Sequence, residues 1–365
     1  MRKHNVDNEL AKRNYLAWMK NAAGRDEATL DQAAAAIGAY EAHTRHADFR
    51  TFRHQKAVAF KEHLAEQSNS ATGEPLSKST MHSRTRALKT FFEWLSREPG
   101  YRNKVRFSDA AYFGLSKNDV RRATGPREQA TPSLEQVIRV LEVMPGESVT
   151  QRRDRAVVAF VILTGARDSA VASMRLKHVD LAARRVTQDP REVATKGAKT
   201  IVSDFFSVGD LPVRIVTDWI GELRVKELFG PDDPIFPASR RGLDAAGLFV
   251  TEGLDRVSWT SAAPIRAVFK RAFGAADLPY FPPHSFRRTL TNVAYDLNLS
   301  TRELKAWSQC LGHSSMLTTL TSYGALTVDE QGRAMAGITD GLGADADRLA
   351  KLADEMASLA RRRRG

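Results

Sequence analysis

The sequence predicts a mainly helical α+β fold with a small β-sheet in its second half. Over the first 96 residues, apolar side chains recur at helical spacing, as in the stripe of Leu88, Phe91 and Leu95. From Arg185 to Val208 the pattern changes to an alternation broken by turn residues, which favours short strands. A chain of 365 residues with 42% hydrophobic content is long enough for two globular domains with separate cores.

The first 96 residues are predicted to form helices joined by polar segments. Their apolar stripes contain Leu10, Tyr15, Trp18 and Met19, then Leu30, Ala34, Ile37 and Tyr40, then Phe49, Phe52, Val58, Phe60 and Leu64. The polar stretch 68–79 is a loop by composition. The helix after this loop carries Arg84, Arg86 and Lys89 close to its apolar stripe, so one of its edges is basic.

Positive charge is in excess, and most of the excess lies upstream of residue 131. The net charge is +12 with a pI near 9.9, and residues 1–130 hold 23 lysines and arginines against 15 aspartates and glutamates. This balance indicates a polyanionic partner, although ribosomal, membrane-surface and nucleic-acid-binding proteins all share it. Candidate contacts to that partner are Arg84, Arg86, Lys89, Arg266 and Lys270, with a merely solvated surface as the alternative.

Cysteine usage and hydropathy exclude several classes of protein. The single cysteine, Cys310, excludes an internal disulfide framework and a multi-cysteine metal site, and suits a reducing cytosol. The first ten residues lack the apolar core of a signal peptide, and the longest apolar run, from Ala156 to Leu163, is far below a membrane span of ~20 residues. We therefore expect a cytoplasmic protein without a membrane partner.

The middle of the chain is predicted to contain a linker, helices and the small sheet. Residues 97–130, with Pro99 and Pro126, have the composition of a linker, and a helix opens at Thr131 or Ser133. The sheet has three strands, with turns at Asp189-Pro190 and at Lys196-Gly197. The other expected elements are helices over Arg153–Leu163, Val213–Leu228 and Pro264–Phe273, and a loop over Pro231–Leu248 that Phe236 anchors.

Four residues that suit phosphodiester chemistry lie close together in the sequence: His284, Arg287, His313 and Tyr323. Cleavage of a phosphodiester without metal needs planar cations that grip the non-bridging oxygens, which Arg287 can supply. It also needs a nucleophile and a proton donor for the departing oxygen. Tyr323 is the candidate nucleophile.

Local patterns favour a shared site for these residues. His284 and Arg287 lie three residues apart, so a helix that begins near Phe286 would point both side chains to one side. Ser300 and Glu303 form a capping-box signature for a helix that should end at Gly312, which leaves His313 on the turn just after it.

Taken singly, each residue has an ordinary structural alternative, since most histidines and tyrosines are core or surface residues. The ordered set carries more weight: TGARDSA, TKGAKT, HSFRR, LGHSS and then a tyrosine ten residues after the last histidine. In this set the chain, over about residues 131–335, resembles the tyrosine recombinases, also called phage integrases. The resemblance implies six catalytic residues, which are Arg167, Lys196, His284, Arg287, His313 and Tyr323.

Three positions depart from the family pattern. Asp168 stands where a hydrophobic residue is usual, Ala170 where a glutamate is usual, and His178 where an aspartate is frequent. Tyr323 also lies one residue further from His313 than is commonest. None of these changes removes a catalytic group, although the support of Arg167 is expected to differ.

The resemblance implies an organisation in four parts. These are an N-terminal helical core-binding domain (1–96), a linker (97–130), an integrase-type catalytic domain (131–335) and a C-terminal helix with a basic tail (336–365). Leu349, Leu352, Met356 and Leu359 form one apolar stripe before Arg361–Arg364. We expect this helix to dock on a neighbouring protomer, with packing in cis or a nucleic-acid-binding tail as the alternatives.

The implied activity is site-specific recombination of double-stranded DNA through a 3′-phosphotyrosyl intermediate, without metal or cofactor. Lys196 would protonate the leaving 5′ oxygen, and His284 would act as proton acceptor or as hydrogen-bond support. The family further implies a homo-tetramer on specific DNA sites, accessory directionality proteins, and integration or excision of mobile DNA at the nucleoid. The alternatives are a type IB topoisomerase and a non-catalytic DNA-binding protein, whereas a metal-dependent nuclease is disfavoured because no carboxylate cluster has ligand spacing.

Overall fold

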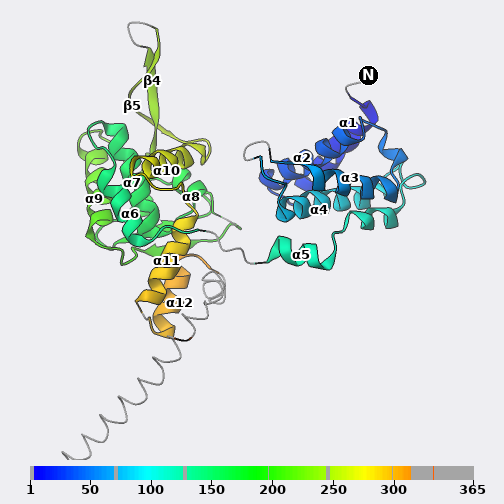
Figure 1. The fold of residues 1–365 in the computed structure, drawn as a ribbon. Coiled ribbons are helices and arrows are strands. Elements are labelled where there is room, and N and C mark those ends of the chain that lie inside the picture. Colours follow the sequence, from blue (N-terminus) through cyan, green and yellow to red (C-terminus); the bar gives the residue numbers. More distant parts are fainter. Residues whose placement is uncertain are drawn as a thin grey trace, which may run out of the picture. The chain divides into compact units, whose positions relative to one another are not determined.

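The computed structural model describes residues 4–69, 73–125, 130–195, 197–243, 247–297, 299–313 and Gly332. The chain divides into two compact units, Met1–Arg127 and Glu128–Gly365. Both are mainly helical, and the described strands, all in the second unit, form two small antiparallel sheets (Figure 1). The predicted fold class is therefore confirmed. None of the described helices is both long enough and apolar enough to cross a membrane.

The first unit is a helical bundle around an aromatic core. Its helices are α1 (Val6–Asn21), α2 (Glu27–His43), α3 (His54–Glu66), α4 (Lys78–Leu95) and α5 (Lys117–Thr124). Side-chain oxygens of Asn5, Asp26, Ser77 and Ser116 cap α1, α2, α4 and α5. Tyr40 of α2 is buried and packs edge to face against Phe60 and Phe92, which join α2 to α3 and α4.

The buried stripe of α1 differs from the predicted one. Leu10 is 56% exposed, whereas Ala11 and Tyr15 are buried. The reason is the buried Asn8, whose side-chain amide nitrogen donates to the Glu41 carboxylate at 3.2 Å. Its amide oxygen accepts from the backbone of Phe49 at 3.0 Å. This polar anchor turns the helix so that Leu10 faces outward.

Residues 97–125, which we expected to be a linker, belong to the first unit instead. Tyr101, Val105 and Phe113 are part of its core, and Phe113 stacks on Phe52 with ring centroids 5.6 Å apart. The charged residues of this segment suggested a solvated connection, but a short 3-10 helix (Phe107–Phe113) places Ala110 and Phe113 in the core.

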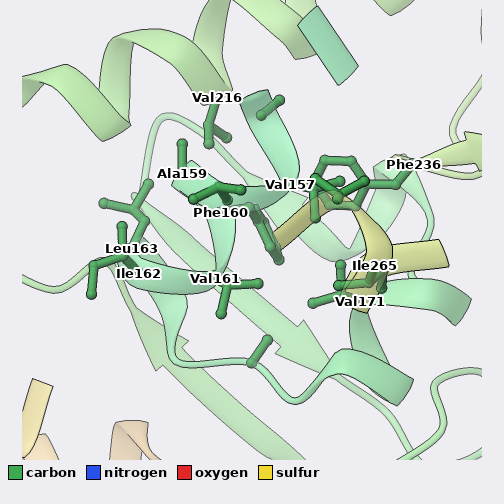
Figure 2. Close-up of a cluster of buried hydrophobic side chains, with 14 of the residues drawn as sticks. Val157, Ala159, Phe160, Val161, Ile162, Leu163, Val171, Val216, Phe236 and Ile265 are labelled. Carbon is green, nitrogen blue, oxygen red and sulfur yellow. The ribbon is translucent and has the colours of Figure 1, made fainter. Parts of the chain in front are cut away.

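The second unit is built around one buried helix. Its helices are α6 (Leu134–Val143), α7 (Val149–Thr164), α8 (Asp168–Ser173), α9 (Asp210–Val225), α10 (Ala263–Ala275), α11 (Ser285–Asp296) and α12 (Thr301–Cys310). All residues from Ala156 to Thr164 are fully buried, so the second half of α7 is surrounded by the core on every side. Figure 2 shows Val216 of α9, Ile265 of α10 and Val171 of α8 in the same apolar cluster as α7.

Capping boxes define the starts of three of these helices. The expected pair of Ser300 and Glu303 caps α12, and Ser133 with Gln136 caps α6. Ser148 and Gln151 do the same for α7, which therefore begins four residues before the predicted Arg153. Helix starts are set by neighbouring side chains, so the recognised box of Ser300 and Glu303 predicted its helix start, whereas the box at Ser148 was missed.

The predicted three-stranded sheet exists with a different first strand. It consists of β1 (Val179–Asp180), β2 (Arg185–Gln188) and β3 (Ile201–Asp204), paired antiparallel in that order. The first strand precedes Arg185, because the chain turns after Asp189. The carbonyl of Asp189 accepts from the N–H groups of Glu192 and Val193 in this turn. The connection from β2 to β3 therefore contains Lys196, which itself lies outside the described residues.

The expectation of a loop over Pro231–Leu248 was wrong in its second half. Strands β4 (Pro237–Leu243) and β5 (Phe249–Ser258) pair antiparallel and project from the helical body of their unit (Figure 1). Two register shifts interrupt the ladder, and Arg240 pairs with Gly253. The strands are held by backbone pairing and lack a regular apolar alternation, so the sequence pattern did not reveal them. Phe236 is buried, as expected.

Replacement of Gly165 by alanine is expected to destabilise the second unit. Gly165 has φ 61°, and a Cβ there would lie 2.8 Å from Leu311 and 3.2 Å from Leu290. We expect Gly165→Ala to lower the free energy of unfolding by about 1–3 kcal/mol. Urea unfolding measures this loss. Gly221→Ala is the control, because Gly221 lies inside α9 with open space around it. An equal loss in both variants would contradict the steric argument.

Candidate active site

The end of α7 presents Arg167. Gly165 caps α7 in the left-handed conformation, and two residues later Arg167 is the N-cap of α8. The side chain of Arg167 is half-buried, and burial lowers its pKa. Its guanidinium is therefore already partly stripped of water, which strengthens its attraction for an anion.

Arg287 joins three elements of the second unit. It lies in the first turn of α11 and is only 7% exposed. One guanidinium nitrogen donates to the carbonyl of Gly165 at 2.6 Å, and the other terminal nitrogen donates to the carbonyl of Leu311. Burial, followed by the charge of Arg167, lowers its pKa to about 9, so Arg287 remains charged at neutral pH.

Two histidines complete a cluster with these arginines. His284 is the N-cap of α11, and His313 follows Gly312, whose φ of 66° turns the chain after α12. Burial lowers the pKa of His313 to about 4, and the charges of Arg287, Arg167 and His284 add to that effect. Burial also lowers the pKa of His284, and the charges of Arg287 and Arg167 lower it further. Both imidazoles are therefore neutral at neutral pH.

The structure thus brings together four of the six predicted catalytic residues: Arg167, His284, Arg287 and His313. The charge of each arginine contributes, after burial, to the lowered pKa of both histidines. Such effects between charges fade over about 10 Å. Two fixed cations beside two neutral imidazoles can bind an anion and exchange protons with it. Lys196 and Tyr323 lie outside the described residues.

The turn that carries His313 is fastened from two sides. The hydroxyl of Ser203 in β3 donates to the carbonyl of Cys310 at 2.6 Å, and the indole of Trp307 donates to the carbonyl of Leu290 at 3.0 Å. These bonds tie the end of α12 to the sheet and to α11. Cys310 itself is half-buried against the core.

Helix α8 also holds the chain just before Lys196. The hydroxyl of Ser169 donates to the carbonyl of Ala194 at 3.3 Å, and the N–H of Ala194 donates to the hydroxyl of Ser173 at 2.9 Å. The backbone two residues before Lys196 is therefore bound to the helix that starts after Arg167. Nothing in the sequence pattern indicated these two serines, because the contact joins residues more than twenty positions apart.

The residues that depart from the family pattern are each held by local contacts or packing. Asp168 does not pair with Arg167 but accepts from Arg266 of α10 at 2.9 Å, and Ala170 is buried. His178 is buried, with Nδ1 accepting from the N–H of Arg175 and Nε2 2.7 Å from the Glu192 carboxylate. His178 therefore ties the chain after β2 to the turn before β1.

The five candidate DNA contacts lie in different settings. Arg84 is half-buried and borders a surface hollow with Gln67 and Ser77, whereas Arg86 is exposed. Lys89 lies 3.7 Å from the Glu93 carboxylate. In the second unit, Lys270 is exposed on α10, and Arg266 is engaged by Asp168. These five residues remain predicted DNA contacts.

Lys199 lies beside His313 of the cluster. It borders a hollow that is also lined by Ile201, Gln309 and His313. Its position makes it a rival to Lys196 as a proton donor. Among the described residues, no group of three or more His, Cys, Asp or Glu side chains is arranged to hold a metal ion.

Comparison with known proteins agrees with this arrangement. Residues 133–330 match the model of the phage integrase family. Tyrosine recombinase XerC of Pseudomonas entomophila (strain L48) is 26% identical over 212 residues, which cover 56% of this chain and 61% of that protein. The match thus spans less than two thirds of that relative's length.

Solved structures share the fold. A lambda integrase (75–356) dimer bound to a COC' core site has a TM-score of 0.58 at 13% identity, covering 87% of this chain and 97% of that one. The Tn1549 transposon integrase in complex with a circular intermediate DNA has a TM-score of 0.56 at 15% identity, covering 89% and 98%. Since the family model spans more than half of the sequence, the chain belongs to the phage integrase family.

Proposed function

We propose that this protein is a site-specific DNA recombinase that cuts and rejoins double-stranded DNA through a 3′-phosphotyrosyl intermediate. The observation that carries the proposal is the cluster of Arg167, Arg287, His284 and His313, supported by membership of the phage integrase family. Two guanidinium groups suit the two non-bridging oxygens of a phosphodiester. The neutral imidazoles can accept or donate one proton each at neutral pH.

The proposed reaction is a reversible transesterification. The hydroxyl oxygen of Tyr323 attacks phosphorus, the bond from phosphorus to the 5′ oxygen breaks, and Lys196 protonates that oxygen. Arg167, Arg287 and His313 stabilise the charge of the transition state, and His284 accepts the tyrosine proton or supports the phosphate by a hydrogen bond. A 5′-hydroxyl from another strand then attacks the phosphotyrosine and releases Tyr323, so no nucleotide cofactor is consumed.

The proposed partners follow from this reaction. Strand exchange needs two DNA duplexes with specific sites, for which we propose a homo-tetramer assembled on DNA, with accessory proteins that set direction. Integration or excision of mobile DNA fits the structural likeness to a transposon integrase. We place the protein in the cytoplasm at the nucleoid, with the first unit as the core-binding domain, a catalytic domain over 131–335 and the C-terminal helix of 336–365 docking on a neighbour. That helix is outside the described part of the chain.

The nucleophile is tested by trapping. Wild-type protein, mixed with nicked suicide DNA that carries candidate sites in the presence of EDTA, is expected to form a covalent adduct on denaturing gels. Tyr323→Phe should form none, because phenylalanine lacks the attacking oxygen. Tyr280→Phe is the control: Tyr280 is 45% exposed and lies near Asp168, so it is the alternative nucleophile. Loss of the adduct in Tyr280→Phe but not in Tyr323→Phe would overturn the assignment.

A second assay separates recombination from topoisomerase activity. A recombinase is supported if the adduct leads to joined products, and if these products form only when both DNA molecules carry the same site. Relaxation of supercoiled DNA without such a site, together with no exchange between two sites, would instead identify a type IB topoisomerase. Salt-sensitive DNA binding without any adduct would identify a non-catalytic DNA-binding protein.

The proton donor is tested with a substrate whose leaving oxygen is replaced by sulfur, which needs little protonation. Lys196→Ala is expected to slow cleavage of ordinary DNA by roughly 10²–10⁴-fold and to regain near wild-type rates on the sulfur substrate. Lys199→Ala should cleave both substrates at similar rates to wild type. Single-turnover kinetics measure each rate. If the sulfur substrate does not restore the cleavage rate of Lys196→Ala, Lys196 is not the general acid. If only Lys199→Ala is slow on ordinary DNA and restored on the sulfur substrate, Lys199 is the general acid instead.

A further inference from the structure

An ion pair adjoins the phosphate-binding arginine. Asp168, the first residue of α8, directly follows Arg167, and its carboxylate accepts from the guanidinium Nε of Arg266 at 2.9 Å. The side chains of Asp168 and Arg266 are 24% and 60% exposed. The pair joins α8 to α10 across 98 residues of sequence.

The field of Asp168 reaches the candidate site. Burial is the main cause that lowers the pKa of His284, and the Asp168 carboxylate acts in the opposite direction. Burial raises the pKa of Tyr280. The charge of Arg266 lowers this pKa, and the charge of Asp168 raises it. Asp168 and Arg266 therefore share an electrostatic environment with the cluster.

A carboxylate at this position is unfavourable for phosphate binding unless it is neutralised. The N–H of Ser169 donates to the second carboxylate oxygen of Asp168 at 2.9 Å, so one oxygen is held by the backbone and the other by Arg266. Two like charges held roughly 6–10 Å apart near a protein surface repel, in general, by an amount that changes a rate constant about tenfold or more. Arg266 cancels most of that repulsion while it stays paired.

We propose that Arg266 is a positioning residue that neutralises Asp168 and holds it in place, so that Arg167 meets the scissile phosphate in a site of net positive charge. This inference rests on the proposed function and deepens it. Arg266 then promotes cleavage through Asp168 and not by its own contact to DNA. The role differs from the direct DNA contact that its exposed position on a basic helix suggested.

The test is a double-mutant cycle on DNA cleavage. Arg266→Ala leaves the Asp168 charge unpaired and is expected to slow single-turnover cleavage about tenfold or more. Asp168→Asn removes the charge and should leave the rate within about threefold of wild type, and the double variant should regain that rate. If the double variant is as slow as Arg266→Ala, Arg266 acts on DNA directly and the proposal is wrong. It is equally wrong if Asp168→Asn alone is as slow.

Arg271→Ala is the matched control. Arg271 lies on the same helix, is 64% exposed, and makes one contact of 2.7 Å to Asp154. Asp154 is near the start of α7, on the order of 15 Å along that helix from the turn before Arg167. Removal of this pair should leave the cleavage rate unchanged. A loss equal to that of Arg266→Ala would mean that any ion pair of α10 matters, which contradicts the proposal.

A titration of free protein separates this inference from the proposed function. NMR detection of the His284 ring should show a higher pKa in Arg266→Ala than in wild type, because the unpaired carboxylate stabilises the imidazolium. The double variant should lose that increase. An unchanged pKa in Arg266→Ala would overturn the coupling even in a protein that cleaves DNA. Conversely, the expected titration without any covalent adduct would overturn the proposed function and leave the ion pair's effect on the site established.

Discussion

The buried guanidinium of Arg287 is the interaction on which the second unit depends. Its two hydrogen bonds hold the glycine turn after α7 and the end of α12 against α11, so three segments meet at one cation. A buried charge without partners is costly, and these carbonyls offset the loss of water. The same two segments lead to Arg167 and His313, which places the candidate phosphate site around Arg287.

Charge in this site is arranged before any ligand enters. Burial, and then the charges of the two guanidinium groups, lower the pKa of both histidines, so the cluster has fixed cations and neutral proton carriers at neutral pH. Such preorganised donors stabilise developing negative charge without reorganisation during the reaction. Asp168 is a negative charge next to this positive site. Its ion pair with Arg266 neutralises that carboxylate.

Helix starts and the fold class were predictable because their signals are local. The capping box of Ser300 and Glu303 and the apolar run of α7 need only neighbouring residues. The hairpin of β4 and β5 was missed because its strands are joined by backbone pairing with two register shifts and carry no regular apolar alternation. The segment with Tyr101 and Phe113 was taken for a linker because charge obscured its few apolar residues, which the first core buries.

The sequence by itself determined which reactive groups the chain carries, their order, and the family pattern into which they fall. It also determined the spacing of three residues that brings His284 and Arg287 to one turn at the start of α11. Only the tertiary structure decided how Arg287 is anchored, which carboxylate meets Arg266, and how Ser173 holds Ala194. The first two contacts join residues 122 and 98 positions apart. Pairings at that separation depend on how whole elements pack, and a local pattern carries no information about them.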